Sequence, residues 1–199
     1  MRADLIDHTN AALFESQLSA FFAARHDIYV EELTWRPPAV DGLERDPFDT
    51  LAATYLVVTD ENRLVAGSRL VPTSEPHLAS EYFAETLNRA PLPREADIVE
   101  WTRGFIVAGR RERGGMRLKA YCCAAVMEYC LAARMRRVGG MQDVRWLSLW
   151  RRMGWRAHIY GDPMEIDGRS WLPAYCDVTE EAMMGARQRA GVTGSILHA

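Results

Sequence analysis

The segment IVEWTRGFIVAGRRERGG, residues 98–115, decides the fold class of this chain. Residues 98–107 are mostly apolar, β-branched or aromatic, a composition typical of a strand. A basic, glycine-rich stretch, residues 109–115, follows, and a helical pattern then runs from about Met116 to Arg137. A strand, a tight loop and a long helix in this order indicate a mixed sheet covered by helices.

Apolar patterns elsewhere in the chain predict the remaining elements. Two apolar runs, 52–59 and 64–71, flank the polar residues 60–63 and indicate a hairpin. The other predicted elements are strands at 3–6, 144–147, 158–160 and 174–178, helices at 11–33 and 180–189, and a partly helical segment at 77–88. We therefore predict an α/β (α+β) fold in one domain, residues 1–199, because a chain of 199 residues that is 48% hydrophobic can bury a substantial core.

Composition excludes several classes of protein. No apolar run approaches the ~20 residues that a membrane span requires, and the N-terminal residues lack the apolar core of a signal peptide, so we expect a cytoplasmic protein. The net charge of −3 argues against general nucleic-acid binding. We expect neither a metal site nor a disulfide, because the cysteines show no paired CxxC spacing and most lie in a helical pattern, as small core residues do. These cysteines are Cys122, Cys123, Cys130 and Cys176.

A second informative segment is RHDIYVEELTWRPPAVDGLERDPFD, residues 25–49, which we call the acidic bend. Its prolines and Gly42 keep it out of regular helix, so its carboxylates could converge on one cationic small molecule. Tyr29 and Trp35 could offer aromatic faces to the same ligand. A solvated acidic loop without a ligand is the alternative. The carboxylates in question are Glu44, Asp46 and Asp49.

Charged residues also interrupt two apolar strand patterns. Arg69 lies in the strand-like GSRLVPT, residues 67–73, and an unpaired buried guanidinium would cost several kcal/mol. Arg69 should therefore face a carboxylate from Glu100, Asp46 or Asp49. This pair could serve the chemistry or could be a purely structural ion pair.

The segment IVEWTR, residues 98–103, carries the other charges. Strand alternation places Glu100 and Thr102 on one face of the sheet and Trp101 and Arg103 on the other. A bulge at Gly104 or its neighbours would be needed to bring Arg103 to the face of Glu100. Trp101 fits either the core or a substrate contact.

Together these residues resemble the signature of the acyl-homoserine-lactone synthases, the LuxI-type autoinducer synthases of bacterial quorum sensing. The similarity is best over residues 20–110. Tyr29 stands where phenylalanine is commoner in the family, which keeps the ring and adds a hydroxyl. The matching residues are Arg25, Tyr29, Trp35, Asp46, Asp49, Arg69, Glu100 and Arg103.

The resemblance implies the GNAT-like acyltransferase fold, a mixed central sheet with splayed strands flanked by helices. The pantetheine arm of a thioester donor enters between the splayed strands of that fold. The implied reaction acylates the α-amine of S-adenosylmethionine, forms the lactone and releases methylthioadenosine. Both S-adenosylmethionine and the thioester are substrates, so no cofactor is expected.

The resemblance also implies roles for individual residues. Glu100 is the first choice as the base that deprotonates the amine and Asp46 the second, and the backbone around Arg103 would stabilise the oxyanion. The implied substrate-binding residues are Arg25, Tyr29, Trp35, Asp49, Arg69, Trp101, Thr102 and Phe105. The expected acyl-pocket residues are Met127, Met141, Trp146 and Leu149. The expected donor phosphate loop contains Arg110, Arg111, Arg113, Gly114 and Gly115.

The sequence leaves the donor open between acyl-CoA and an acyl carrier protein, with Tyr29 favouring acyl-CoA. Arginines between Arg110 and Arg152 could form a docking face for an acidic carrier protein, or they could simply be solvated. Two other functions remain: a GNAT-type N-acyltransferase acting on another amine, and a non-catalytic module that binds a carrier protein or a cation.

Overall fold

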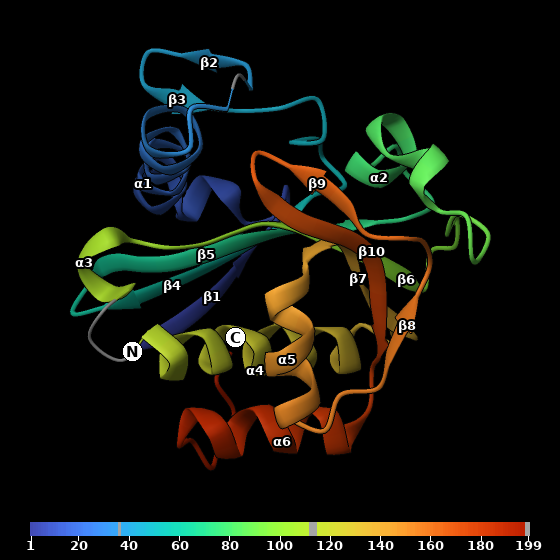
Figure 1. Cartoon of the computed structure of the whole chain (residues 1–199). Helices are drawn as coiled ribbons and strands as arrows, with labels where there is room; N and C mark the ends of the chain where they lie inside the picture. Colours follow the sequence, from blue (N-terminus) through green and yellow to red (C-terminus); the bar gives the residue numbers. More distant parts are fainter. Residues whose placement is uncertain (36, 112–114, 198–199) are drawn as a thin grey trace.

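A central sheet with helices on both faces organises the molecule (Figure 1). The computed structural model describes residues 1–35, 37–111 and 115–197. One face, which we call the α1 face, carries α1 (Glu15–Arg25), the hairpin β2 (Ala39–Val40) and β3 (Leu43–Glu44), and α2 (Leu78–Tyr82). The opposite α4 face carries α4 (Gly115–Ala132), α5 (Val144–Arg152) and α6 (Glu180–Ala190).

The sheet is mixed, as predicted. Its strand order is β1-β4-β5-β6-β7-β10-β8, with β9 paired to β10, and only the β6–β7 pair among these is parallel. The strands are β1 (Arg2–Ile6), β4 (Thr54–Asp60), β5 (Arg63–Pro72), β6 (Ile98–Ile106), β7 (Arg137–Asp143), β8 (Ala157–Ile159), β9 (Met164–Ile166) and β10 (Arg169–Asp177). The predicted hairpin at 52–71 is the β4–β5 pair.

The two central strands part after a short contact. β6 pairs with β7 only from Ile98 to Glu100, opposite Arg137 to Gly139, although both strands continue beyond these residues. Gly139 permits close packing of β7 on β10, because a Cβ there would lie 2.1 Å from the backbone oxygen of Ala174. The splayed strands expected from the family resemblance are therefore present.

Two predictions around the middle of the chain are wrong. The helix expected to reach Arg137 ends at Ala132, and residues 137–143 form β7 instead. The strand expected at 144–147 is the first turn of α5, which begins there because Asp143 accepts a hydrogen bond from the backbone N–H of Arg145 at 3.0 Å. Two adjacent glycines hide β7 in the sequence, since glycine weakens a strand pattern.

The predicted helix at 11–33 is composite. A 3₁₀ turn, η1 (Ala11–Leu13), precedes α1, and the π-helix η2 (His26–Glu32) follows it. The segment predicted as partly helical contains α2 and the 3₁₀ turn η3 (Ala84–Thr86).

Separate apolar cores fill the two faces. On the α1 face, Phe21 and Phe22 of α1 pack against Tyr55, Val57 and Phe105 of the sheet. On the α4 face, the buried side of α4 packs against the sheet and α6. All four cysteines are buried with free thiols, as expected of small core residues. Within the described residues, no helix has the length and apolar character needed to cross a membrane.

Candidate functional site

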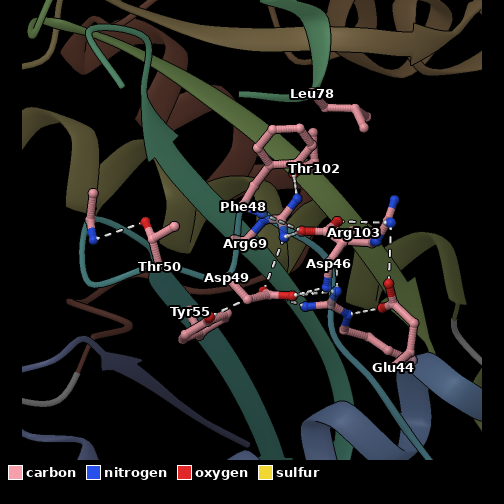
Figure 2. A network of polar contacts seen from close by, with 12 residues as sticks. Glu44, Asp46, Phe48, Asp49, Thr50, Tyr55, Arg69, Leu78, Thr102 and Arg103 are labelled. Carbon is pink, nitrogen blue, oxygen red and sulfur yellow. Dashed lines mark hydrogen bonds and ion pairs between the residues drawn. The ribbon is translucent and has the colours of Figure 1, made fainter. Parts of the chain in front are cut away.

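Six charged side chains form a buried cluster on the α1 face, where the acidic bend meets the centre of the sheet. Figure 2 labels five of them, which come from β3, the loop after β3, and the strands β5 and β6. The cluster consists of Arg25, Glu44, Asp46, Asp49, Arg69 and Arg103. The three carboxylates therefore converge, and the groups that they meet are arginines of the protein itself.

Arg25 closes the cluster from the end of α1. Its Nη1 and Nη2 donate to the two oxygens of Asp49 at 2.7 and 2.9 Å, and its Nε donates to Glu44. Burial by itself would raise the pKa of Asp49, but the hydrogen bonds from Arg25 and the charge of Arg69 outweigh it and lower the pKa to about 2. The cluster thus fastens the acidic bend to α1.

Arg69 supplies the second guanidinium from β5. Its Nη1 contacts Asp46 and lies 3.0 Å from Oδ1 of Asp49, and its Nη2 donates to Oγ1 of Thr102 at 3.2 Å. The carboxylate that a buried arginine was expected to require is therefore present. It comes from the acidic bend and not from Glu100.

Arg103 joins the cluster through a bulge in β6. Gly67 lies opposite Phe105 and Arg69 opposite Thr102, so one residue of β5 faces two of β6. Arg103 takes a φ of +53° within this bulge, and its Nη2 lies 2.8 Å from Asp46. The bulge predicted near Gly104 is confirmed. It turns Arg103 to the face of Thr102, at a backbone cost of about 1–3 kcal/mol that its ion pairs offset.

Two aromatic rings stand beside the bulge. The rings of Tyr29 and Trp35 are stacked with centroids 5.1 Å apart and planes 20° from parallel. The Tyr29 hydroxyl donates to the backbone oxygen of Gly104 at 3.1 Å, and burial raises the pKa of Tyr29 to about 12. The guanidinium carbon of Arg103 lies 5.2 Å from the Tyr29 ring centroid. The Tyr29 hydroxyl thus contacts the backbone of the bulge.

The cluster balances its own charge, with three guanidinium groups against three carboxylates. Each carboxylate lies within ion-pair distance of an arginine of the cluster. The carboxylates of the acidic bend are therefore not a free acidic site. Asp46 is also one of the described residues that line a cavity of about 280 Å³. The lining residues of this smaller cavity are Trp35, Pro37, Pro38, Asp46, Pro47, Phe48, Leu78, Tyr82 and Arg103.

A larger cavity of about 820 Å³ lies where β6 and β7 part. Trp35, Leu78 and Arg103 border both cavities, so the two adjoin each other on the α1 face. The larger cavity is also bordered by Lys119 and Trp146 from α4 and α5, so it extends to the α4 face. The residues predicted from the sequence that line this cavity are Tyr29, Trp35, Trp101, Thr102, Arg103, Phe105, Arg111, Met141 and Trp146.

Glu100 lies outside this arrangement. Its side chain is fully buried, and its two oxygens accept hydrogen bonds from the backbone N–H groups of Leu78 and Ala79 at 2.9 and 2.8 Å. Burial raises the pKa of Glu100, with the charge of His77 opposing the shift. Glu100 is absent from the described linings of both cavities. Glu100 instead contacts the start of α2, where Leu78 borders both cavities.

The remaining predicted residues divide between cavity and core. Met127 and Leu149 are buried in the core of the α4 face and are not among the described residues that line the larger cavity. Arg111 borders that cavity and pairs with Glu32, whereas Arg110 pairs with Asp60 at the surface. Arg110 and Arg111 are the last two residues of α3 (Ala108–Arg111), and Gly115 begins α4. Arg113 and Gly114 of the expected phosphate loop lie outside the described residues.

Sequence reasoning missed several residues that line the larger cavity. Leu78 and Phe83 come from the segment that was predicted only as partly helical. Lys119 also borders this cavity, and it could have been singled out in the sequence because it is the sole lysine of the chain. The missed residues also include Cys122, Gln142, Asp143, Arg145, Asp167, Arg169 and Trp171.

Comparison with known proteins decides the family. Residues 9–185 match the autoinducer synthase family. This chain belongs to that family. It is 32% identical over 190 residues to the isovaleryl-homoserine lactone synthase of Bradyrhizobium diazoefficiens, covering 94% of this chain and 84% of the relative.

Solved structures of autoinducer synthases also superpose on this chain. The CoA-dependent acyl-homoserine lactone synthase MesI superposes with a TM-score of 0.89 at 32% identity, covering 98% of both chains. BjaI, another CoA-dependent synthase, solved with SAM and isopentyl-CoA, has a TM-score of 0.90 at 31% identity, covering 99% of this chain and 92% of BjaI. An N-acetyltransferase from Lactobacillus plantarum shares the fold at 18% identity, with a TM-score of 0.54.

These matches confirm the predicted LuxI-type family, the GNAT-like fold and the assignment as an acyltransferase that makes a quorum-sensing signal. They test none of the roles predicted for single residues.

Proposed function

We propose that this autoinducer synthase transfers an acyl group from acyl-CoA to the α-amine of S-adenosylmethionine, forms the lactone and releases methylthioadenosine. One observation carries the proposal: a cavity of about 820 Å³ at the splayed β6 and β7 adjoins a second, aromatic cavity beside the cluster. A reaction between a long thioester and a nucleoside needs two such spaces that meet.

The smaller cavity suits S-adenosylmethionine. Trp35, Phe48 and Tyr82 provide aromatic surface for an adenine ring and a cation–π face for the sulfonium. Asp46 is the cluster carboxylate that borders this space. Its other contacts with Arg69 and Arg103 hold it in place. We assign the nucleoside and sulfonium to this cavity and the reacting amine to its junction with the larger one.

The larger cavity suits the thioester donor. Beyond Glu100, the β6 edge that faces β7 has no strand partner among the described residues, so backbone groups there can bind pantetheine. The backbone oxygen of Trp101 is an exception, since it accepts from the side chain of Gln142. Arg111 lies beside this cavity, near the start of α4, where a phosphate is favoured. The names of MesI and BjaI describe CoA-dependent enzymes, and both resemble this chain along nearly its whole length. We therefore assign acyl-CoA as the donor.

Proton transfer precedes attack on the thioester carbonyl. A free α-amine has a pKa of ~7.7–8.0, so the protonated fraction must lose a proton before the nitrogen can attack. Asp46 borders the cavity and Glu100 does not, so we give Asp46, directly or through water, the first place as acceptor. Glu100 then acts by holding α2 and Leu78 in position. This order reverses the one inferred from the sequence.

The later steps use the bulge and the substrate itself. Backbone N–H groups around Gly104 would stabilise the tetrahedral oxyanion, since a bulge releases them from the strand ladder. Collapse of the intermediate expels the CoA thiol and forms the amide. The substrate carboxylate then attacks the carbon beside the sulfonium, and the C–S bond breaks to release neutral methylthioadenosine. This step depends chiefly on orientation.

The test is to identify the products formed by purified protein with S-adenosylmethionine and isovaleryl-CoA. We expect an acyl-homoserine lactone and methylthioadenosine by mass spectrometry. Free thiol that appears only when another amine is added would instead establish a general N-acyltransferase. Binding of the thioester without turnover would establish a binding module.

A further inference from the structure

Side chains of the protein occupy three backbone oxygens on the free edge of β6, the part of that edge that faces β7 beyond the paired residues. A strand edge without a partner offers both N–H and C=O groups to a ligand. On this edge each of the three oxygens already accepts a hydrogen bond from a side chain that borders the larger cavity. The donors and the residues whose oxygens accept are Gln142 to Trp101 at 3.3 Å, Tyr29 to Gly104 at 3.1 Å and Arg111 to Ile106 at 2.8 Å.

The N–H groups near the bulge point to the same free edge. The backbone N–H of Val107 donates to the oxygen of Val65 in β5 at 3.0 Å. Successive residues of a strand direct their backbone groups to opposite edges, so Ile106 and Gly104 point away from β5. Both residues border the larger cavity. Because their oxygens are occupied, they offer a ligand mainly their N–H groups, which suit an oxygen that carries negative charge.

Sterics do not hold the backbone at Gly104. A Cβ built there would meet no described atom within 4 Å outside its chain neighbours, and Arg103 before it has a φ of +53° in the bulge. Glycine also has the widest choice of backbone angles. The hydrogen bond from Tyr29 ties the Gly104 carbonyl to the opposite wall of the cavity.

Tyr29 is itself firmly placed for this contact. The residue is 5% exposed, and its ring stacks on Trp35 with centroids 5.1 Å apart. The guanidinium carbon of Arg103 lies 5.2 Å from the same ring centroid. Burial raises the pKa of Tyr29 to about 12, so the hydroxyl keeps its proton near neutral pH and donates it to the Gly104 oxygen.

We propose that Tyr29 is a positioning residue for acyl transfer: its hydroxyl binds the Gly104 oxygen and thereby aims the N–H groups of the free edge at the thioester carbonyl. As the amine nitrogen bonds to the thioester carbon, the π pair of the C=O bond moves to oxygen, and this oxyanion accepts from the N–H groups. Tyr29 touches no reacting atom and acts through Gly104. This proposal rests on the function proposed above and adds a residue to it.

The test is Tyr29→Phe, which removes the hydroxyl and keeps the ring. The control is Tyr129→Phe, the same chemical change on α4, at a tyrosine whose hydroxyl lies 3.4 Å from that of Thr54 and which is not among the described residues that line either cavity. The measured quantity is the rate of CoA thiol release in a single turnover, with enzyme and S-adenosylmethionine in excess over isovaleryl-CoA. We expect about a tenfold loss in Tyr29→Phe, the size typical of one hydrogen bond, and the wild-type rate in the control.

A second ligand separates positioning from damage to the cavity. Isopentyl-CoA has the same carbon chain as isovaleryl-CoA but lacks the carbonyl oxygen, so its calorimetric Kd should be the same in wild type and Tyr29→Phe. The KM for S-adenosylmethionine should also stay unchanged. A wild-type rate of thiol release in Tyr29→Phe would overturn the proposal. A rate loss matched by equally weaker binding of isopentyl-CoA would overturn it as well, because the hydroxyl would then shape the cavity and not the carbonyl site.

The two proposals fail in different ways. If the wild-type protein releases no methylthioadenosine with any acyl-CoA, the proposed function fails, and amide hydrogen exchange then tests Tyr29. Exchange in peptides that span residues 101–107 should be faster in Tyr29→Phe than in wild type and in Tyr129→Phe, because the bulge has lost a tie. Unchanged exchange would overturn the positioning role. If Tyr29→Phe releases thiol and methylthioadenosine at wild-type rates, the positioning role fails and the proposed function stands.

Discussion

Arg103 and Asp46 form an ion pair of 2.8 Å that joins the bulge of β6 to the acidic bend. The pair holds a non-glycine residue at a φ of +53° beside both cavities. Its contribution is therefore geometric, because it fixes the backbone on which both substrates are expected to meet. The cluster is neutral in sum, so it can hold this geometry without attracting a counterion.

The aromatic wall of the smaller cavity gives a prediction about substrate affinity. Trp35→Ala should raise KM for S-adenosylmethionine about tenfold and KM for acyl-CoA less. Trp35 borders both cavities, but the larger one keeps the aromatic surface of Tyr29 and Trp171 when this ring is removed. Steady-state kinetics with each substrate varied in turn measures both constants. Exposed Leu51→Ala is the matched control. Equal changes in both constants would show that Trp35 supports the fold and not the nucleoside site.

Removal of Arg25 should destabilise the protein strongly. Arg25→Met leaves Glu44 and Asp49 short of a partner in a buried site, for which a loss of about 3–5 kcal/mol in the free energy of unfolding is typical. Urea denaturation measures the loss. Arg89→Met provides the control, because Arg89 pairs with Asp162 at the surface, where ion pairs contribute little. Similar losses in the two variants would argue against the cluster as the clamp of the acidic bend.

Acid should weaken the same cluster through Asp49. Its pKa is lowered from 3.8 to about 2 in the folded protein, so the unfolded chain binds its proton at higher pH than the folded protein does. The stability from Asp49 is therefore complete above about pH 5 and is lost as the pH falls toward 2. Asp49→Asn should lower stability at pH 7 and flatten this acid dependence. An unaltered acid dependence in the variant would assign the effect to other carboxylates.

Substitution of Glu100 tests whether this residue holds α2 in position or accepts the proton of the amine. Glu100→Gln should lower kcat/KM about tenfold, because the amide cannot accept hydrogen bonds from both N–H groups at the start of α2. The shape of the pH–rate profile should stay the same. If Glu100 were the base, the variant would instead lose the ascending limb of that profile.

Sequence reasoning located the charged cluster and the bulge for a physical reason. Arg69 in an apolar strand requires a buried partner, and Gly104 next to Arg103 permits a break in strand alternation, so both could be inferred from local chemistry. The sequence did not reveal which carboxylate pairs with Arg69, because that choice depends on how the acidic bend folds onto α1.

Other features depended on packing that no local pattern shows. β7 was missed because Gly139 and Gly140 are selected by close contact with β10 and with Glu100, not by strand propensity. Met127 was expected in the acyl pocket, yet α4 turns it into the core, whereas Lys119 of the same helix borders the cavity. Because α4 is apolar on most of its surface, the sequence did not show which side of this helix faces the cavity.

The central claim is that this enzyme uses a CoA thioester to acylate S-adenosylmethionine. The most direct measurement follows free thiol and methylthioadenosine together, with the same acyl group presented on CoA and on acyl carrier protein. We predict equal amounts of thiol and methylthioadenosine with acyl-CoA, and a higher kcat/KM for acyl-CoA than for the carrier-linked donor at low and at high salt. Turnover with the carrier-linked donor alone, or thiol release without methylthioadenosine, would contradict the account.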